Sequence, residues 1–275
     1  MPIRLPMRSK SIAQSLIPLT SRSLEWQRTD VILSATAAYI EGVRGLGWSP
    51  SVEQEAISAA RWMKYDEGFV VIDAGANVGN WITTFCRTIK SKGHIYAFEP
   101  QPGAAAVIRD RHIDGCEVSE VALGSKAGKM TFYTEHQTDT RGSLYERHDS
   151  FVVGKQYKRT EVEVMLLDDF VQTHAIRKID FMKMDLEGAE LEALKGASAC
   201  MREGILRAFS FEFGVSNVNA RVFFLDIFNL LGSNHYEIFR LTPGGRLIHV
   251  NHYSEDLEIF ARTTTYFARY AGLQS

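Results

Sequence analysis

The sequence feature that most constrains the fold is a short apolar run that ends in an aspartate and two glycines. Residues 69–79 read FVVIDAGANVG. Such a run predicts a buried parallel strand that enters a tight turn and then a helix. Gly75 lets the backbone turn sharply and approach a ligand because it has no Cβ. Asp73 is predicted at the carboxyl end of the strand, where open α/β sheets bind their ligands.

The glycine spacing narrows the class of ligand. A dinucleotide site needs G-x-G-x-x-G, but Asn77 and Asn80 stand at the second and third glycine positions, and no P-loop ending follows. A second apolar strand, residues 94–98, leads to Glu99, twenty residues after Gly79. A carboxylate there can accept hydrogen bonds from both hydroxyls of a ribose. These features predict a site for a nucleoside without a pyrophosphate.

Several motifs, in order along the chain, resemble those of one enzyme family. Residues 73–81 (DAGANVGNW) and 96–102 (YAFEPQP) resemble the first two motifs of class I S-adenosylmethionine methyltransferases. Residues 178–197 (KIDFMKMDLEGAELEALKGA) resemble the signature of the FkbM family of O-methyltransferases. Ser143–Leu144 and the LDDF segment at 167–170 add two further points of likeness. The resemblance covers about half of the chain.

The resemblance implies a Rossmann-like α/β fold. Its mostly parallel seven-stranded sheet would carry an antiparallel C-terminal strand and helices on both faces. Residues 1–68 are predicted to form an N-terminal helical extension or cap, and residues 69–275 the methyltransferase domain. Alternation at 130–135 and 161–170 predicts an inserted β-hairpin. The long polar loop between these strands could close as a lid within residues 128–170, or it could be a solvated surface loop.

Local signals predict further elements. Ser51 and Gln54 can form a capping box for a helix through about Glu67. Ser216 can cap another helix that ends at Gly232. Antiparallel strands around turns are expected at residues 236–242, 246–253 and 258–263.

The resemblance also indicates which residues contact the cofactor, S-adenosylmethionine. Asn77 and Asn80 could donate to its methionine carboxylate, or could serve only to tolerate left-handed turn conformations. Val121 and Ala122 are candidates by position, because the chain passes the adenine there in class I enzymes. The predicted cofactor-binding residues are Asp73, Gly75, Ala76, Asn77, Gly79, Asn80, Glu99, Pro100, Val121, Ala122, Ser143 and Asp185.

Asp185 and Glu187 are the predicted catalytic residues. Methyl transfer is an in-line displacement that requires donor and acceptor to be aligned, and a hydroxyl acceptor also needs a base. Asp185 could contact the cofactor ammonium or orient the acceptor, and Glu187 could be the base. The alternative is that both complement the dipole of the helix that follows. Glu190 and Glu192 are expected to be exposed on that helix, and Glu212 is a weaker catalytic candidate.

The eight histidines show no metal-binding spacing such as H-E-x-x-H, so no metal site is predicted. The sequence leaves open whether Asp185 and Glu212 together bind a divalent cation. His249 and His252 flank a predicted strand and could reach the acceptor, although a lone strand histidine is more often structural.

Charge and cysteine content limit the partners and the compartment. A net charge of −2 gives no global field that would attract nucleic acid. The three cysteines are far apart and odd in number, which favours reduced thiols in the cytoplasm. No run of 18 apolar residues predicts a membrane span. The short apolar run near the N terminus favours a loosely docked arm over a signal peptide. The sequence leaves open whether the protein forms a homo-oligomer.

The expected function is S-adenosylmethionine-dependent O-methylation of a sugar, a glycan or a polyketide-like small molecule, as the resemblance implies. An N-methyltransferase of protein or nucleic acid is the first alternative. It is disfavoured because residues 184–187 read MDLE, where such enzymes often carry an Asn-Pro-Pro-Tyr-type motif. A non-catalytic module that binds S-adenosylmethionine is the second alternative. The missing glycines disfavour a nicotinamide-dependent dehydrogenase.

Overall fold

The computed structural model consists of two compact units, residues 1–41 and residues 42–275. Helix α2 (Trp26–Val43) begins in the first unit, and its large apolar side chains from Val31 to Val43 are exposed. No helix in the described part of the chain is both long and apolar enough to cross a bilayer. The structure describes residues 26–63, 68–89, 91–136, 138–148 and 156–272.

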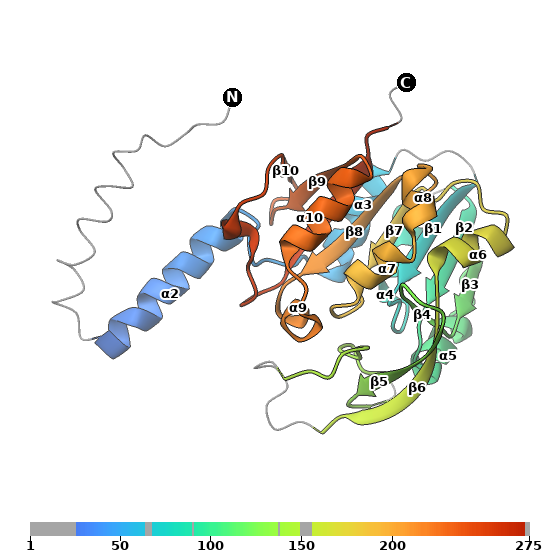
Figure 1. Cartoon of the computed structure of the whole chain (residues 1–275), viewed down its shortest axis with the longest axis horizontal. Coiled ribbons are helices and arrows are strands. Elements are labelled where there is room, and N and C mark those ends of the chain that lie inside the picture. The colour runs from blue at the N-terminus through green and yellow to red at the C-terminus, as the bar shows by residue number, and fades with distance from the viewer. Residues whose placement is uncertain (1–25, 64–67, 90, 137, 149–155, 273–275) are drawn as a thin grey trace. The chain divides into compact units, whose positions relative to one another are not determined.

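The larger unit is built on an eight-stranded sheet with the order β10-β9-β11-β8-β7-β1-β2-β3 (Figure 1). The five strands from β8 to β3 are parallel, and β11 runs antiparallel to both β8 and β9. This arrangement confirms the predicted mostly parallel sheet with an antiparallel C-terminal strand, and β10 adds an eighth strand at the edge. The strands are β1 (Phe69–Ala74), β2 (Gly93–Phe98), β3 (Cys116–Ser119), β7 (Phe181–Met184), β8 (Ala208–Phe213), β9 (Tyr236–Leu241), β10 (Leu247–His249) and β11 (Thr264–Tyr270).

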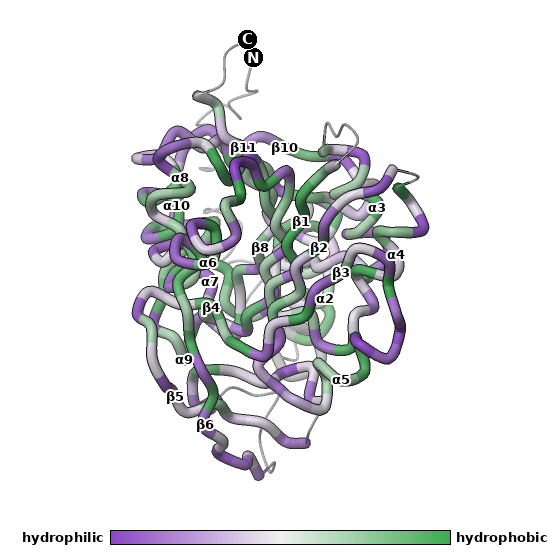
Figure 2. The backbone as a smooth tube through the Cα atoms, turned by 90° about the vertical axis from the view of Figure 1, so that its right-hand side faces the viewer, coloured by the Kyte–Doolittle hydropathy of each residue, from purple (hydrophilic) through white to green (hydrophobic). Residues whose placement is uncertain are grey.

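Helices cover both faces of this sheet. Helices α3, α4 and α5 share one apolar core with the sheet, and α6, α7, α8 and α10 share the other. Strand alternation divides the two cores, so Phe181 faces the first and Met182 the second. Figure 2 shows the hydrophobic residues concentrated in the central strands. The helices are α3 (Val52–Trp62), α4 (Asn80–Thr88), α5 (Pro102–Asp110), α6 (Leu167–Thr173), α7 (Glu190–Lys195), α8 (Ser198–Arg202), α9 (Val215–Ala220) and α10 (Phe224–Ser233).

The predicted hairpin is present as a separate small sheet with the order β4-β6-β5. Strands β5 (Gly128–Thr134) and β6 (Lys158–Met165) pair antiparallel, and the short β4 (Ala122–Leu123) joins β6. The prediction that the second strand continues to residue 170 is wrong, because α6 begins at Leu167. Asp168 on that helix accepts hydrogen bonds from two backbone N–H groups at the start of α8, which fixes this segment as a helix.

Two other predictions near the C terminus are wrong. Residues 258–263 form no strand, and the last strand is β11, which begins at Thr264. Most of β11 is buried between two neighbouring strands, so its sequence lacks the alternation of a half-exposed strand. Ser216 lies inside α9, and the predicted single helix is broken at Arg221, whose φ is +56°. The capping box of Ser51 and Gln54 is confirmed.

Candidate active site

The glycine turn after β1 brings the ends of three strands together. The N–H groups of Gly75 and Ala76 both donate to the carbonyl of Phe98 at the end of β2. Gly75 has φ +76°, and a Cβ built on it would lie 2.0 Å from the carbonyl oxygen of Asp185 after β7. Only glycine fits there, because both the backbone angle and the neighbouring carbonyl exclude a side chain. Asn77 also adopts a left-handed conformation, with φ +46°.

Glu99 follows β2 and is held by backbone groups on both sides. Its Oε2 accepts a hydrogen bond from the N–H of Asn77, and its Oε1 accepts one from the N–H of Gln101, each at 2.8 Å. Burial raises the pKa of Glu99, while these two hydrogen bonds favour the ionised form. Because each oxygen keeps a further lone pair, the carboxylate is oriented and can still accept from two ligand hydroxyls.

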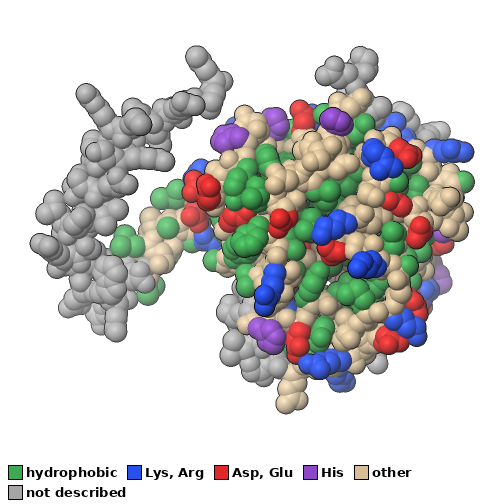
Figure 3. Space-filling model, viewed as in Figure 1, with side chains coloured by type: hydrophobic (Ala, Val, Ile, Leu, Met, Phe, Trp, Pro, Cys, Tyr) green, Lys and Arg blue, Asp and Glu red, His purple; other side chains and the backbone are tan. Residues whose placement is uncertain are grey.

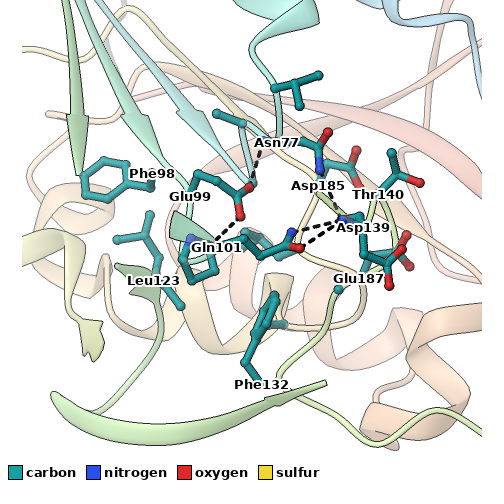
Figure 4. Close-up of a pocket in the computed structure, with 18 of the residues that line it drawn as sticks. Asn77, Phe98, Glu99, Gln101, Leu123, Phe132, Asp139, Thr140, Asp185 and Glu187 are labelled. Carbon is teal, nitrogen blue, oxygen red and sulfur yellow. Dashed lines mark hydrogen bonds between the residues drawn. The ribbon is translucent and has the colours of Figure 1, made fainter. Parts of the chain in front are cut away.

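The loop after β5 is held by hydrogen bonds from two side chains, one in the glycine turn and one just after Glu99 (Figure 4). Gln101 Nε2 and Asn77 Nδ2 both donate to the carbonyl of Asp139, at 2.9 and 3.1 Å. The N–H of Asp139 donates to Gln101 Oε1 at 3.0 Å. The described part of the predicted lid therefore docks on the cofactor motifs. Residues 137 and 149–155 of the predicted lid lie outside the described residues.

Lys183 on β7 joins two carboxylates on one face of the sheet. Its Nζ lies 3.4 Å from Asp73 Oδ1 and 3.4 Å from Asp185 Oδ2, and it donates to the carbonyl of Gly75 at 3.2 Å. Asp73 is 0% exposed; burial raises its pKa, and Lys183 opposes that rise. Burial lowers the pKa of Lys183, but Asp73 and Asp185 together outweigh that effect and raise it. This network stabilises the junction between β1 and β7.

Glu187 lies in the turn after β7 with φ +49°, and it interacts with the loop above. Its Oε2 accepts a hydrogen bond from Arg147 Nη1 at 2.8 Å, and its backbone carbonyl accepts one from Ser143 Oγ at 2.8 Å. The Arg147 side chain is only 2% exposed. Burial and the nearby Asp185 raise the pKa of Glu187 to about 8, and Arg147 opposes this rise. Glu187 is thus a partly buried carboxyl, 21% exposed, whose raised pKa lets it exchange a proton near neutral pH.

Glu190 is only 1% exposed, so its predicted position on the exposed helix surface is wrong. Its carboxyl oxygens accept from the N–H groups of Leu186 and Gly188, at 2.9 and 3.0 Å. Burial raises its pKa to about 7. Glu190 therefore fixes the turn that carries Asp185 and Glu187.

Glu212, the weaker candidate, lies on β8 on the same side of the sheet as Lys183. Ser49 Oγ donates to its Oε1 at 2.6 Å, and burial and the charge of Asp185 raise its pKa. His249 lies on β10 at the far edge of the sheet, where its ring stacks on Phe239. No three His, Cys, Asp or Glu side chains of the described segments lie where they could hold a metal ion together.

Glu99, Lys183, Asp185 and Glu187 are among the residues that line a cavity of about 180 Å³. Phe98 and Leu123 lie toward one end, Asp185 and Glu187 toward the other, and Glu99 between them (Figure 4). Asp73, Gly79 and Ser143 are predicted cofactor residues that do not line this cavity; each supports a residue or turn that does. The predicted cofactor residues that do line it are Gly75, Ala76, Asn77, Asn80, Glu99, Pro100, Val121, Ala122 and Asp185.

This order of groups suits a nucleoside that carries an amino acid. An apolar wall can pack on a base, Glu99 can accept from ribose hydroxyls, and Asp185 can accept from an ammonium group. The sequence interpretation assigned no role to Gln101, Lys183 or Arg147. Of these three residues, only Lys183 carried a signal in the sequence. It stands inside the apolar segment MKM, and buried lysines are rare unless they are paired.

Comparison with known proteins identifies the family. A profile described as the Methyltransferase FkbM domain matches residues 73–238, more than half of the chain. The 2-O-methyltransferase NoeI of Sinorhizobium fredii is 28% identical over 170 residues, which cover 58% of this chain and 68% of that protein. Methyltransferase 1 of Beauveria bassiana is 26% identical over 148 residues, which cover 48% of this chain and 59% of that protein.

The hexuronic acid methyltransferase AglP of Haloferax volcanii is 24% identical over 147 residues, which cover 50% of this chain and 53% of that protein. Among solved structures, the precorrin-6y C5,15-methyltransferase of Geobacter metallireducens gives a TM-score of 0.41 at 12% identity, over 80% of this chain and 86% of that chain. The plantazolicin methyltransferase BpumL, solved with S-adenosylhomocysteine, gives 0.41 at 8% identity, over 90% and 91%.

The glycine turn, the acid after β2 and the MDLEG segment after β7 all fall within the residues that the family profile matches. The fold is that of class I methyltransferases, and the cofactor is S-adenosylmethionine. The chain therefore belongs to the FkbM family of S-adenosylmethionine-dependent methyltransferases.

Proposed function

We propose that this enzyme methylates a hydroxyl group of a sugar, a glycan or a polyketide-like small molecule. Two of its relatives are named as a 2-O-methyltransferase and as a hexuronic acid methyltransferase, which supports a sugar acceptor. The observation that carries the proposal is the position of Asp185 and Glu187 at the end of the cavity opposite its apolar wall. Carboxylates at that position can orient a hydroxyl and remove its proton.

The cavity residues divide the cofactor between them. In this assignment Glu99 accepts from the ribose hydroxyls, and Val121 and Ala122 border the adenine. Asp185 accepts from the ammonium group of the methionine moiety. The bound cofactor supplies an activated methyl carbon, so the protein has to align the acceptor and keep water out. The docked loop from Asp139 to Arg147 supports the second task, because it contacts the cofactor motifs.

Glu187 is the proposed general base. A base works best when its pKa is close to the working pH, and burial raises the pKa of Glu187 to about 8. The acceptor hydroxyl would pass its proton to the Glu187 carboxylate as the new C–O bond forms and the bond between the methyl carbon and the cofactor sulfur breaks, which leaves a neutral thioether. Because only the ionised carboxylate can act, the rate is expected to rise as the pH rises through about 8.

The experiment is methyl transfer from labelled S-adenosylmethionine to a panel of neutral sugars, uronic acids, polyketide-like alcohols and amines. We expect label in a methyl ether of an alcohol. The Glu187→Gln change should lower kcat by about 10²- to 10⁴-fold and remove the rise near pH 8. Glu203→Gln, a change in an exposed acid outside the cavity, is the matched control and should leave both unchanged. Label found only on amines, proteins or nucleic acids would contradict the proposal.

A cytoplasmic location is part of the same proposal. All three cysteines are free, as expected of a reducing compartment. On the face shown in Figure 3, basic side chains are interspersed with acidic ones, which supports a small-molecule or glycan acceptor over nucleic acid.

A further inference from the structure

One buried donor in the cavity wall has no acceptor in the described structure. Trp81 lies in the first turn of α4, lines the cavity and is 2% exposed. Its Nε1 is buried and makes no hydrogen bond to any described residue. A buried N–H group without an acceptor destabilises the folded protein, and tryptophans whose rings are buried usually direct this group to a partner. The missing acceptor is therefore expected to come from a ligand.

The ring of Trp81 is fixed, so its N–H has a fixed position. It stacks on Phe85 with ring centroids 4.9 Å apart and lies parallel to Phe181 of β7 at 6.2 Å. Phe181 and Lys183 are two residues apart on β7, so their side chains lie on the same face of the sheet. Trp81 covers this face. Trp81 thus belongs to the end of the cavity near β7, together with Lys183 and Asp185 and away from the apolar wall at Leu123.

Two other donors near this end of the cavity, Lys183 and the side-chain amide of Asn77, already have partners. The charge of Lys183 is balanced by Asp73 and Asp185. The side-chain amide of Asn77, a predicted donor to the methionine carboxylate, instead donates to the Asp139 carbonyl of the docked loop. An incoming carboxylate would meet the acids Asp185 and Glu187, so it needs an N–H donor that these acids do not already occupy.

We propose that the indole N–H of Trp81 binds the methionine carboxylate of S-adenosylmethionine, while Asp185 receives the ammonium group. This inference rests on the proposed placement of the ribose at Glu99, which sets the direction of the cofactor in the cavity. Trp81 is then a cofactor-binding residue that discriminates amino-acid-bearing nucleosides from those that lack the carboxylate. Its aromatic stacking keeps the donor in place before the ligand arrives.

The test compares two ligands on two variants by calorimetry. The ligands are S-adenosylhomocysteine and its decarboxylated analogue, which keeps the amine and lacks only the carboxylate. Trp81→Phe removes the N–H and keeps an aromatic ring, and it should weaken S-adenosylhomocysteine binding by about tenfold to hundredfold. Binding of the decarboxylated analogue should change by less than about threefold, because it does not use this donor. Trp62→Phe, which alters a tryptophan packed outside the cavity, should change neither.

Three results would overturn the inference. These are no loss for S-adenosylhomocysteine, an equal loss for both ligands, or a carboxylate-selective loss in Asn80→Ala but not in Trp81→Phe. If Trp81→Phe does not fold, β-(3-benzothienyl)alanine at position 81 replaces the N–H with sulfur at nearly constant shape and gives the same reading. A wild-type protein that binds neither ligand would refute the cofactor placement together with this inference. Failure to methylate any sugar would refute only the proposed acceptor.

Discussion

The ion-paired Lys183 gives the sharpest test of how this site is held together. Its side chain is 8% exposed. Among the described residues, Lys183 is the only cation that forms an ion pair with Asp73. Neither carboxylate oxygen of Asp73 has a hydrogen-bond partner among the described residues. In Lys183→Met a fully buried carboxylate would lose its counter-ion. Breaking such a pair from one side costs about 3–5 kcal/mol, a large part of the roughly 5–15 kcal/mol that stabilises a typical protein.

The loss should depend on pH. Burial already raises the pKa of Asp73 from 3.8, and removal of Lys183 would raise it further. A carboxyl whose pKa is higher in the folded state stabilises that state below its unfolded pKa, and this contribution is lost as the pH rises through the folded pKa. The pH range over which this contribution is lost therefore begins near pH 3.8 and extends up to the raised pKa of Asp73. We expect Lys183→Met to be more destabilising at pH 8 than at pH 5.

Urea unfolding followed by circular dichroism at both pH values would measure this effect. The double variant Asp73→Asn with Lys183→Met should recover more than half of the stability lost, because a buried amide needs no counter-ion. Lys129→Met is the matched control: Lys129 pairs with Glu161 on the protein surface at 3.0 Å, and its removal should have no measurable effect. Equal losses at both pH values, or no recovery in the double variant, would refute the reasoning.

Three further predictions concern the cofactor cavity. Gly75→Ala should abolish binding of S-adenosylhomocysteine, because its Cβ would lie 2.0 Å from the Asp185 carbonyl; thermal unfolding should show a loss of stability, and an unchanged protein would contradict this. Glu99→Ala should weaken the binding of S-adenosylhomocysteine about hundredfold, as measured by calorimetry, because the ribose hydroxyls would lose their hydrogen bonds to a charged acceptor. A loss of affinity under about threefold would contradict a contact between Glu99 and the ribose. Gln101→Ala should speed proteolysis of the loop near Asp139 by several-fold in the ligand-free protein, and equal cutting in both proteins would mean that Gln101 does not hold it.

Part of the site could be read from local sequence because local chemistry dictates it. The apolar run before Asp73 and the glycine at position 75 predict a strand and a sharp turn wherever they occur. Glu99 ends the next apolar strand, and parallel strands bring their carboxyl ends to one edge. The prediction failed at residues 258–263, because their alternation resembles a strand, whereas β11 is buried and shows none.

Partners, burial and charge state came from the tertiary structure alone. The register of β1 on β7 sets Lys183 opposite Asp73, a pairing that joins residues 110 positions apart and leaves no local pattern. In the same way, the docking of the loop decides that Asn77 and Gln101 hold Asp139, and the packing of α4 on β7 decides that the N–H of Trp81 is left for a ligand. Sequence determined the strands, the turn and the acids at the sheet edge, because backbone preference and hydrophobic period act over a few residues. Only the fold decided what each acid or donor meets, because desolvation and ion pairing depend on neighbours that the chain brings together from a distance.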